Sequence, residues 1–128
     1  MTDQADKYRI EVRAEPAYLE DQSVPGENQY VFAYTITIRN TGTVAARLVS
    51  RHWLIVDANG HEREVRGEGV VGEQPHLPPG GNFRYTSGAM LETPVGSMRG
   101  SYRMLADDGM HFDAPIPVFT LAIPRTLH

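Results

Sequence analysis

The sequence predicts an all-β fold, an antiparallel β-sandwich of about seven to eight strands. Apolar and polar residues alternate with a period of two along most of the chain, and no long stretch keeps the 3.6-residue period of a helix. Turn signals such as Asn59-Gly60 separate these alternating runs at short intervals. The 128 residues suffice for one buried core. We therefore expect one domain over residues 1–128.

The first strand is expected at residues 8–14, where apolar residues alternate with charged ones. We expect it to stop near Pro16, with Tyr18 and Leu19 as an extension beyond a bulge. A polar turn follows at residues 21–28.

The second strand is expected at residues 30–39, with aromatic and β-branched side chains on one face. The third, at residues 47–58, carries apolar residues on both faces, so both faces are expected to be partly buried. Its Trp53 resembles the core tryptophan of immunoglobulin-like domains. After the Asn59-Gly60 turn, residues 62–66 should pair back onto it.

A long loop rich in glycine and proline is expected at Gly67–Gly81. It is followed by a short strand at residues 82–87. The segment 88–96 is interpreted as a second loop, with Met90 and Leu91 placed under the edge of the sheet.

The last strands are expected at residues 98–104, 110–114 and 118–123. Asp107-Asp108-Gly109 predicts a hairpin turn between the first two. Because proline cannot donate a hydrogen bond to the ladder, Pro115 and Pro117 predict an irregular edge.

A GxGxxG pattern at Gly67, Gly69 and Gly72 suggests a loop that binds a dinucleotide. In such folds the pyrophosphate lies at the N-terminus of the following helix. Here three prolines between Pro75 and Pro79 prevent a helix, and residues 82–86 read as a strand. The context therefore excludes a Rossmann unit. A loop of exposed backbone N–H groups, able to form an anion-binding nest, remains.

Composition excludes several classes of function. The chain has no cysteine, so it has no disulfide, thiolate metal site or cysteine nucleophile. Its net charge of -4 does not favour general binding to nucleic-acid phosphate. Residues 1–6 are polar and expected to be flexible, with no signal peptide, and no apolar run is long enough for a membrane span. A cytoplasmic location is expected.

These motifs, in order and over almost the whole chain, resemble the ApaG family. The segments that carry the resemblance are Ser50-Arg51-His52-Trp53, Asp57-Ala58-Asn59-Gly60, Gly67 to Pro75, Pro79-Gly80, Phe83, Tyr85, Ser87-Gly88, Met98, Gly100, Tyr102 and Ile116 to Leu121. The resemblance implies an immunoglobulin-like or fibronectin type III-like sandwich. It also implies an association with cobalt tolerance and magnesium efflux, use as a protein-binding module, and a pyrophosphate site at the glycine motif.

Two interpretations of Gly67, Gly69 and Gly72 stand side by side. In one, their backbone amides bind pyrophosphate or another phosphate-containing small molecule. In the other, which we favour, the glycines only shape the loop. Glu68 and Glu73 place negative charge inside the motif, which would repel an anion.

Metal binding is a second candidate, with His111 and Asp113 sharing one face of a strand. A solvated strand would show the same spacing, and we favour that interpretation. The wider set of side chains able to bind a metal is His52, His61, His76, His111, His128, Asp57, Asp107, Asp108 and Asp113.

His52 is also a candidate general base, but the sequence places no nucleophile beside it. Since no catalytic motif is recognisable by spacing, we expect neither an enzyme nor a cofactor.

Val70, Val71 and Leu77 are apolar residues in the long loop, where they would form a partner surface or, equally, cap the open end of the sandwich. The leading hypothesis is a non-enzymatic binding module that engages a protein partner through the loop at Gly67–Gly81. The alternative is a protein that binds pyrophosphate or a nucleotide, or responds to divalent metal, through the same loop.

Overall fold

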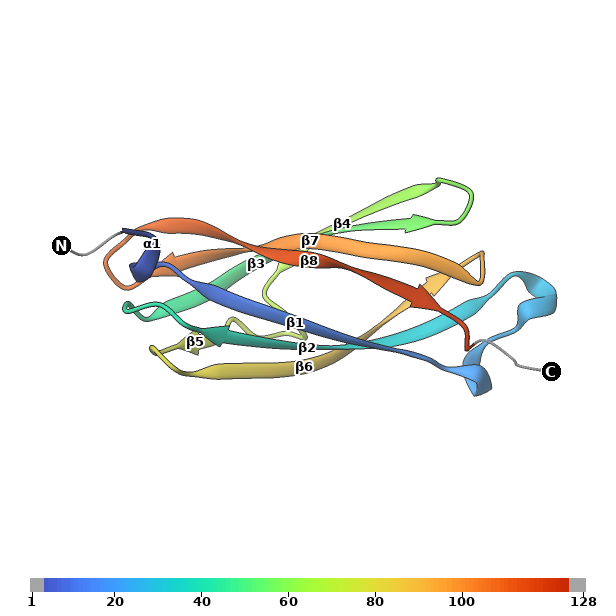
Figure 1. Ribbon diagram of the computed structural model, residues 1–128, viewed down its shortest axis with the longest axis horizontal. Helices are drawn as coiled ribbons and strands as arrows, with labels where there is room; N and C mark the ends of the chain where they lie inside the picture. The colour runs from blue at the N-terminus through green and yellow to red at the C-terminus, as the bar shows by residue number, and fades with distance from the viewer. Residues whose placement is uncertain (1–3, 125–128) are drawn as a thin grey trace.

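Two antiparallel sheets pack face to face in the computed structural model, which describes residues 4–124 (Figure 1). The smaller sheet has the order β1-β2-β6, with β1 at Ile10–Tyr18, β2 at Tyr30–Asn40 and β6 at Asn82–Leu91. The larger sheet has the order β4-β3-β7-β8, with β4 at Glu62–Glu68, β3 at Ala46–Asp57, β7 at Val95–Ala106 and β8 at His111–Ala122. The two-residue β5, His76–Leu77, pairs with the start of β3. This architecture confirms the predicted antiparallel β-sandwich.

Helical structure is confined to short segments in the described part of the chain. They are α1 at Gln4–Lys7 and two 3-10 turns, η1 at Glu20–Gln22 and η2 at Pro25–Glu27, the last two in the predicted polar turn. Of the six N-terminal residues expected to be flexible, residues 1–3 lie outside the described part. None of the helices in residues 4–124 has the length and apolar character needed to cross a membrane.

The core lies between the two sheets, and Trp53 of β3 is at its centre. The indole ring meets Tyr34, Tyr102 and Phe119 with ring centroids 5.4, 6.4 and 5.9 Å apart, in each case edge to face. Such arrangements add to the free energy gained by burying the rings. The expected core role of Trp53 is therefore confirmed.

A β-bulge in β3 explains why both faces of this strand carry apolar residues. Leu48 pairs with Met104 and Ser50 pairs with Arg103, so Val49 is one extra residue on β3. After the bulge, the alternation of side chains between the two faces of the sheet is shifted by one residue. As a result Leu48 and Trp53 both face the core, although a regular strand would place them on opposite faces.

The predicted loop at residues 88–96 is wrong. β6 continues to Leu91 and β7 begins at Val95, leaving only a three-residue turn. Gly88 suggested a break, but it pairs with Ala33 in the regular ladder. Leu91 is buried and pairs with Tyr30, so pairing with the long β2 extends the strand.

Prolines interrupt the edge strands less than expected. β1 runs through Pro16 to Tyr18, and β8 is one strand where the prediction had two, at residues 110–114 and 118–123. Both strands lie at the ends of their sheets, where an N–H that points away from the paired strand makes no ladder bond and can be missing. The irregular edge itself is confirmed, because β8 contains one extra residue between Ile116 and Phe119.

A buried contact between two tyrosines crosses the core from one sheet to the other. The hydroxyl groups of Tyr85 and Tyr102 share a hydrogen bond of 2.6 Å. Burial raises the pKa of Tyr85 to about 12, and burial raises the pKa of Tyr102 further.

These raised pKa values predict alkaline unfolding. Tyrosine side chains in the unfolded chain ionise at about pH 10. Above that pH the unfolded state binds fewer protons than the folded state, so the free energy of unfolding falls as pH rises. We expect the melting temperature to decline steeply above about pH 10. Tyr102→Phe should lose about 1–3 kcal/mol at pH 8, because the Tyr85 hydroxyl loses its partner, and should show a shallower decline.

Melting curves between about pH 8 and pH 11.5 measure both effects. Tyr30→Phe, at a partly exposed tyrosine, is the matched control and should follow the wild-type profile. A Tyr102→Phe profile that matches wild type would contradict the expectation.

Candidate functional site

The glycine loop begins as a tight hairpin directly after β4. Val70 donates its N–H to the carbonyl of Glu73 at 2.8 Å, and Glu73 donates back to the carbonyl of Val70 at 2.9 Å. The two residues between them, Val71 and Gly72, have φ angles of 44° and 80°. Positive φ at both central positions matches a type I′ turn. The motif therefore forms a β-turn where a dinucleotide-binding loop would lead into a helix.

Close packing explains the other two glycines of the motif. A Cβ atom on Gly67 would lie 2.7 Å from Nη2 of Arg51. A Cβ atom on Gly69 would overlap the carbonyl oxygen of Glu73, and Gly69 has a φ of 61°. The structure thus supplies a shaping role for Gly67 and Gly69, and Gly72 occupies the turn.

Arg51 and the bulge of β3 hold the loop in place. Nη1 of Arg51 donates to the carbonyls of Glu68 and Gly69, both at 2.9 Å. The carbonyl of Val49 accepts hydrogen bonds from the N–H of Gly69 at 2.8 Å and from Nε2 of Gln74 at 2.9 Å. The amides of Gly69, Val70 and Glu73 are therefore used inside the protein, which removes them from an anion-binding nest.

The expected partner surface is wrong for two of its three residues. Val70 is only 1% exposed and Leu77 only 3%, and both belong to the hydrophobic core. Val70 is buried because the hairpin folds back onto the sandwich, and Leu77 because β5 pairs with Ala46 of β3. Val71, at the tip, is 55% exposed.

A broad hollow lies on the outer face of the larger sheet, beside the start of the glycine loop. Its volume is about 640 Å³. The residues that line it are Ser50, Arg51, His52, Arg66, Gly67, Glu68, Ser101, Arg103 and Asp113. Ser50 and Ser101 have short side chains, while the residues paired with Ser50, Arg103 and Glu68, are long. This contrast in side-chain length forms the depression.

Charges around the hollow are paired. His52 Nε2 lies 2.6 Å from Oε1 of Glu64, and Arg66 donates to the same oxygen at 2.6 Å. Hydrogen bonds from His52 and Arg66 lower the pKa of Glu64. Arg103 Nη1 lies 3.5 Å from Asp113. The surface thus offers both positively and negatively charged hydrogen-bonding groups, and its net charge is small.

The structure does not join His111, Asp113 or His52 into a metal or catalytic centre. His111 and Asp113 are both exposed on β8, and Asp113 faces Arg103. Within residues 4–124 these two belong to no group of three ligating side chains, and His128 lies outside that range. His52 is hydrogen-bonded to a carboxylate, and no hydrogen bond in the described part joins it to a serine.

Comparison with known proteins identifies the family. The family described as "ApaG domain" (DUF525) matches residues 20–106. The chain belongs to the ApaG domain family. A protein of Azoarcus sp. named Protein ApaG is 67% identical over 124 residues, covering 97% of this chain and 98% of the relative. Protein ApaG of Thiobacillus denitrificans is 62% identical over 122 residues, covering 95% and 96%.

A solved structure agrees with this assignment. The crystal structure of a Bordetella pertussis protein assigned the name ApaA matches with a TM-score of 0.92 and 50% identity, covering 94% of this chain and 98% of that one. The family and sandwich fold inferred from the sequence motifs are both confirmed.

Sequence reasoning missed most of the hollow in this ApaG-family protein. Ser101 and Arg103 lie on β7, far along the chain from Ser50 and His52 on β3, and only the strand register brings them together. The charged alternation of β7 was a signal that these side chains face outward, but it did not indicate what they would meet.

The shaping role of the glycines predicts different tolerance at two positions of the motif. Gly69→Ala should lower the free energy of unfolding by about 2 kcal/mol, because the new methyl group overlaps the Glu73 carbonyl at a positive φ. Gly72→Asn should have little effect, since asparagine tolerates positive φ and a Cβ there meets no atom within 4 Å. Urea unfolding measures both, and equal stability of the two variants would contradict this account.

Proposed function

We propose that this ApaG-family protein is a non-enzymatic binding module, and that the hollow on the outer face of the larger sheet binds a polar segment of a protein partner. One observation carries the proposal. A depression of about 640 Å³, lined by the short side chains of Ser50 and Ser101 and by longer hydrogen-bonding groups, occupies a face that the fold leaves open. This location differs from the one expected from the sequence, since the loop valine Val70 is buried.

The charges favour a polypeptide over a polyphosphate. The arginines Arg66 and Arg103 are paired with the carboxylates Glu64 and Asp113, and Glu68 adds a further negative charge. A ligand with several negative charges would have to displace these carboxylates or accept their repulsion. A peptide with mixed polar groups can instead satisfy donors and acceptors together.

The arrangement around His52 supports a role without catalysis. A general base acts on a nucleophile within hydrogen-bond distance. In the described part of the chain the hydrogen bond of His52 joins it to Glu64, which Arg66 also contacts, and joins it to no hydroxyl group. The association of the family with cobalt tolerance and magnesium efflux stays an expectation, because it assigns no role to any residue of the hollow.

Filling the hollow should abolish partner binding. Ser101→Trp places an indole ring in the depression, whereas Thr86→Trp places the same ring on the exposed outer face of the smaller sheet. Immobilised protein is exposed to an extract of Azoarcus sp., the source of the relative with 67% identity. We expect proteins retained by wild type and Thr86→Trp to be lost with Ser101→Trp, as quantified by mass spectrometry.

The proposal fails if Ser101→Trp, folded by circular dichroism, retains the same proteins as wild type. Titration with inorganic pyrophosphate tests the alternative. The amides of Val71 and Gly72 should show no chemical-shift change at millimolar ligand, and a saturable change there would favour the phosphate hypothesis instead.

A further inference from the structure

A second pocket lies between the β3–β4 hairpin and the β6–β7 turn, and it shares no residue with the hollow. Asp57, the last residue of β3, lines this pocket, and hydrogen bonds hold its side chain in place. Oδ1 of Asp57 accepts the N–H groups of Asn59 and His61 at 2.9 and 3.0 Å. The side chain is only 10% exposed. Oδ2 accepts no hydrogen bond from the described residues and lies 3.5 Å from Nδ1 of His61. One oxygen of a nearly buried carboxylate thus remains available in the pocket.

Hydrogen bonds at two places hold the β6–β7 turn against the β3–β4 hairpin. The buried hydroxyl of Thr93 accepts the N–H of Ala58 at 3.0 Å and donates to the carbonyl of Val95 at 2.8 Å. Nη2 of Arg63 donates to the carbonyl of Met90 at 3.1 Å. The Thr93–Ala58 and Arg63–Met90 bonds connect segments that are distant in the sequence. They fix the turn that carries Glu92 beside Asp57 and His61.

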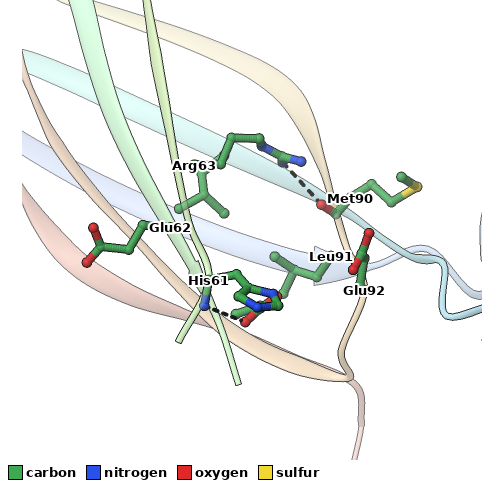
Figure 2. Close-up of a pocket in the computed structure, with 8 residues that line it drawn as sticks. His61, Glu62, Arg63, Met90, Leu91 and Glu92 are labelled. Carbon is green, nitrogen blue, oxygen red and sulfur yellow. Dashed lines mark hydrogen bonds and ion pairs between the residues drawn. The ribbon is translucent and has the colours of Figure 1, made fainter. Parts of the chain in front are cut away.

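Figure 2 shows His61 and Glu92 projecting from the two sides of this pocket, with Arg63 turned toward Met90. One ligand atom from each of Asp57, His61 and Glu92 lies within 4.8 Å of the other two. Within residues 4–124 no other three side chains able to bind a metal lie this close together. The site draws on two separate hairpins and combines an imidazole with two carboxylates.

In a tetrahedral site with bonds of about 2.0–2.2 Å, two ligand atoms of one ion lie about 3.3–3.6 Å apart. Nδ1 of His61 and Oδ2 of Asp57, 3.5 Å apart, already have this spacing. His61 is 74% exposed, and Glu92 is exposed as well, so rotation of these side chains can bring the third ligand atom to this spacing. Asp57 needs no movement, because its turn-capping bonds already orient it.

The donor atoms and the local charge select the kind of ion. A histidine with two carboxylates suits Zn²⁺ and similar first-row transition ions, whereas Mg²⁺ prefers oxygen ligands alone. The acidic residues Asp57, Glu62 and Glu92 outnumber the single arginine, Arg63, among the residues that line the pocket. We propose that Asp57, His61 and Glu92 bind one divalent transition-metal ion, with water in the remaining positions. This inference does not rest on the proposed function.

Isothermal titration with Zn²⁺ tests the site on the full chain after removal of metals with a chelator. We expect one ion per molecule, with amide chemical-shift changes at residues 57–62 and 91–94. His61→Gln and Glu92→Gln should each weaken binding at least about tenfold, since loss of even an outer partner of a metal ligand costs that much. Asp57→Asn should weaken binding similarly while its side-chain oxygen still caps the turn.

His111→Gln is the matched control. It removes another exposed imidazole that lies near a carboxylate, Asp113, on β8, and it should leave Zn²⁺ affinity unchanged. The proposal is overturned if wild type binds no Zn²⁺ at millimolar concentration. It is equally overturned if His61→Gln and Glu92→Gln bind as tightly as wild type, or if His111→Gln removes the binding.

Discussion

The rest of the structure around the site depends on the bulge at Val49 in β3. One extra residue in this central strand allows Leu48 and Trp53 to face the same core. The bulge also frees the Val49 carbonyl from the regular ladder, and this oxygen accepts the hydrogen bonds of Gly69 and Gln74. A single local irregularity therefore joins the sheet to the glycine loop, which explains why the loop folds back onto the sandwich.

Burial of Trp53 then decides which way its neighbours on β3 point. Because side chains alternate along a strand, Arg51 shares the inner side with Trp53, while Ser50 and His52 face outward. Arg51 reaches the carbonyls of Glu68 and Gly69 from within. The glycines of the motif leave room for this guanidinium and for the turn that follows it. The glycines of the motif therefore serve close packing and the turn. The accessible polar side chains lie beside the motif, on the outer face of the sheet.

Much of the fold could be predicted, and the errors have local causes. Alternation located most strands, and Asn59-Gly60 located the β3–β4 hairpin, since these signals depend only on neighbouring residues. Gly88 and Pro115 misled the prediction because glycine and proline are tolerated in strands when a long partner or an edge position compensates. The site was harder to predict. Val70 was predicted to be exposed but is buried, and no sequence motif marks Glu92 as a metal ligand. In both cases the sequence does not show which residues the side chain will contact.

By itself, the sequence determined the β-sandwich class, the exclusion of a Rossmann unit and of cysteine chemistry, and membership of the ApaG family. The fold class and the exclusions follow from composition, periodicity and motif context, which are local or cumulative properties of the chain. The family follows from the resemblance of its ordered motifs to those of ApaG proteins. Only the tertiary structure decided which loop residues are buried and which side chains meet, such as Ser50 with Arg103 or Asp57 with Glu92. The physical reason is strand register. Pairing brings distant residues together, and one bulge residue reverses the face of every position after it.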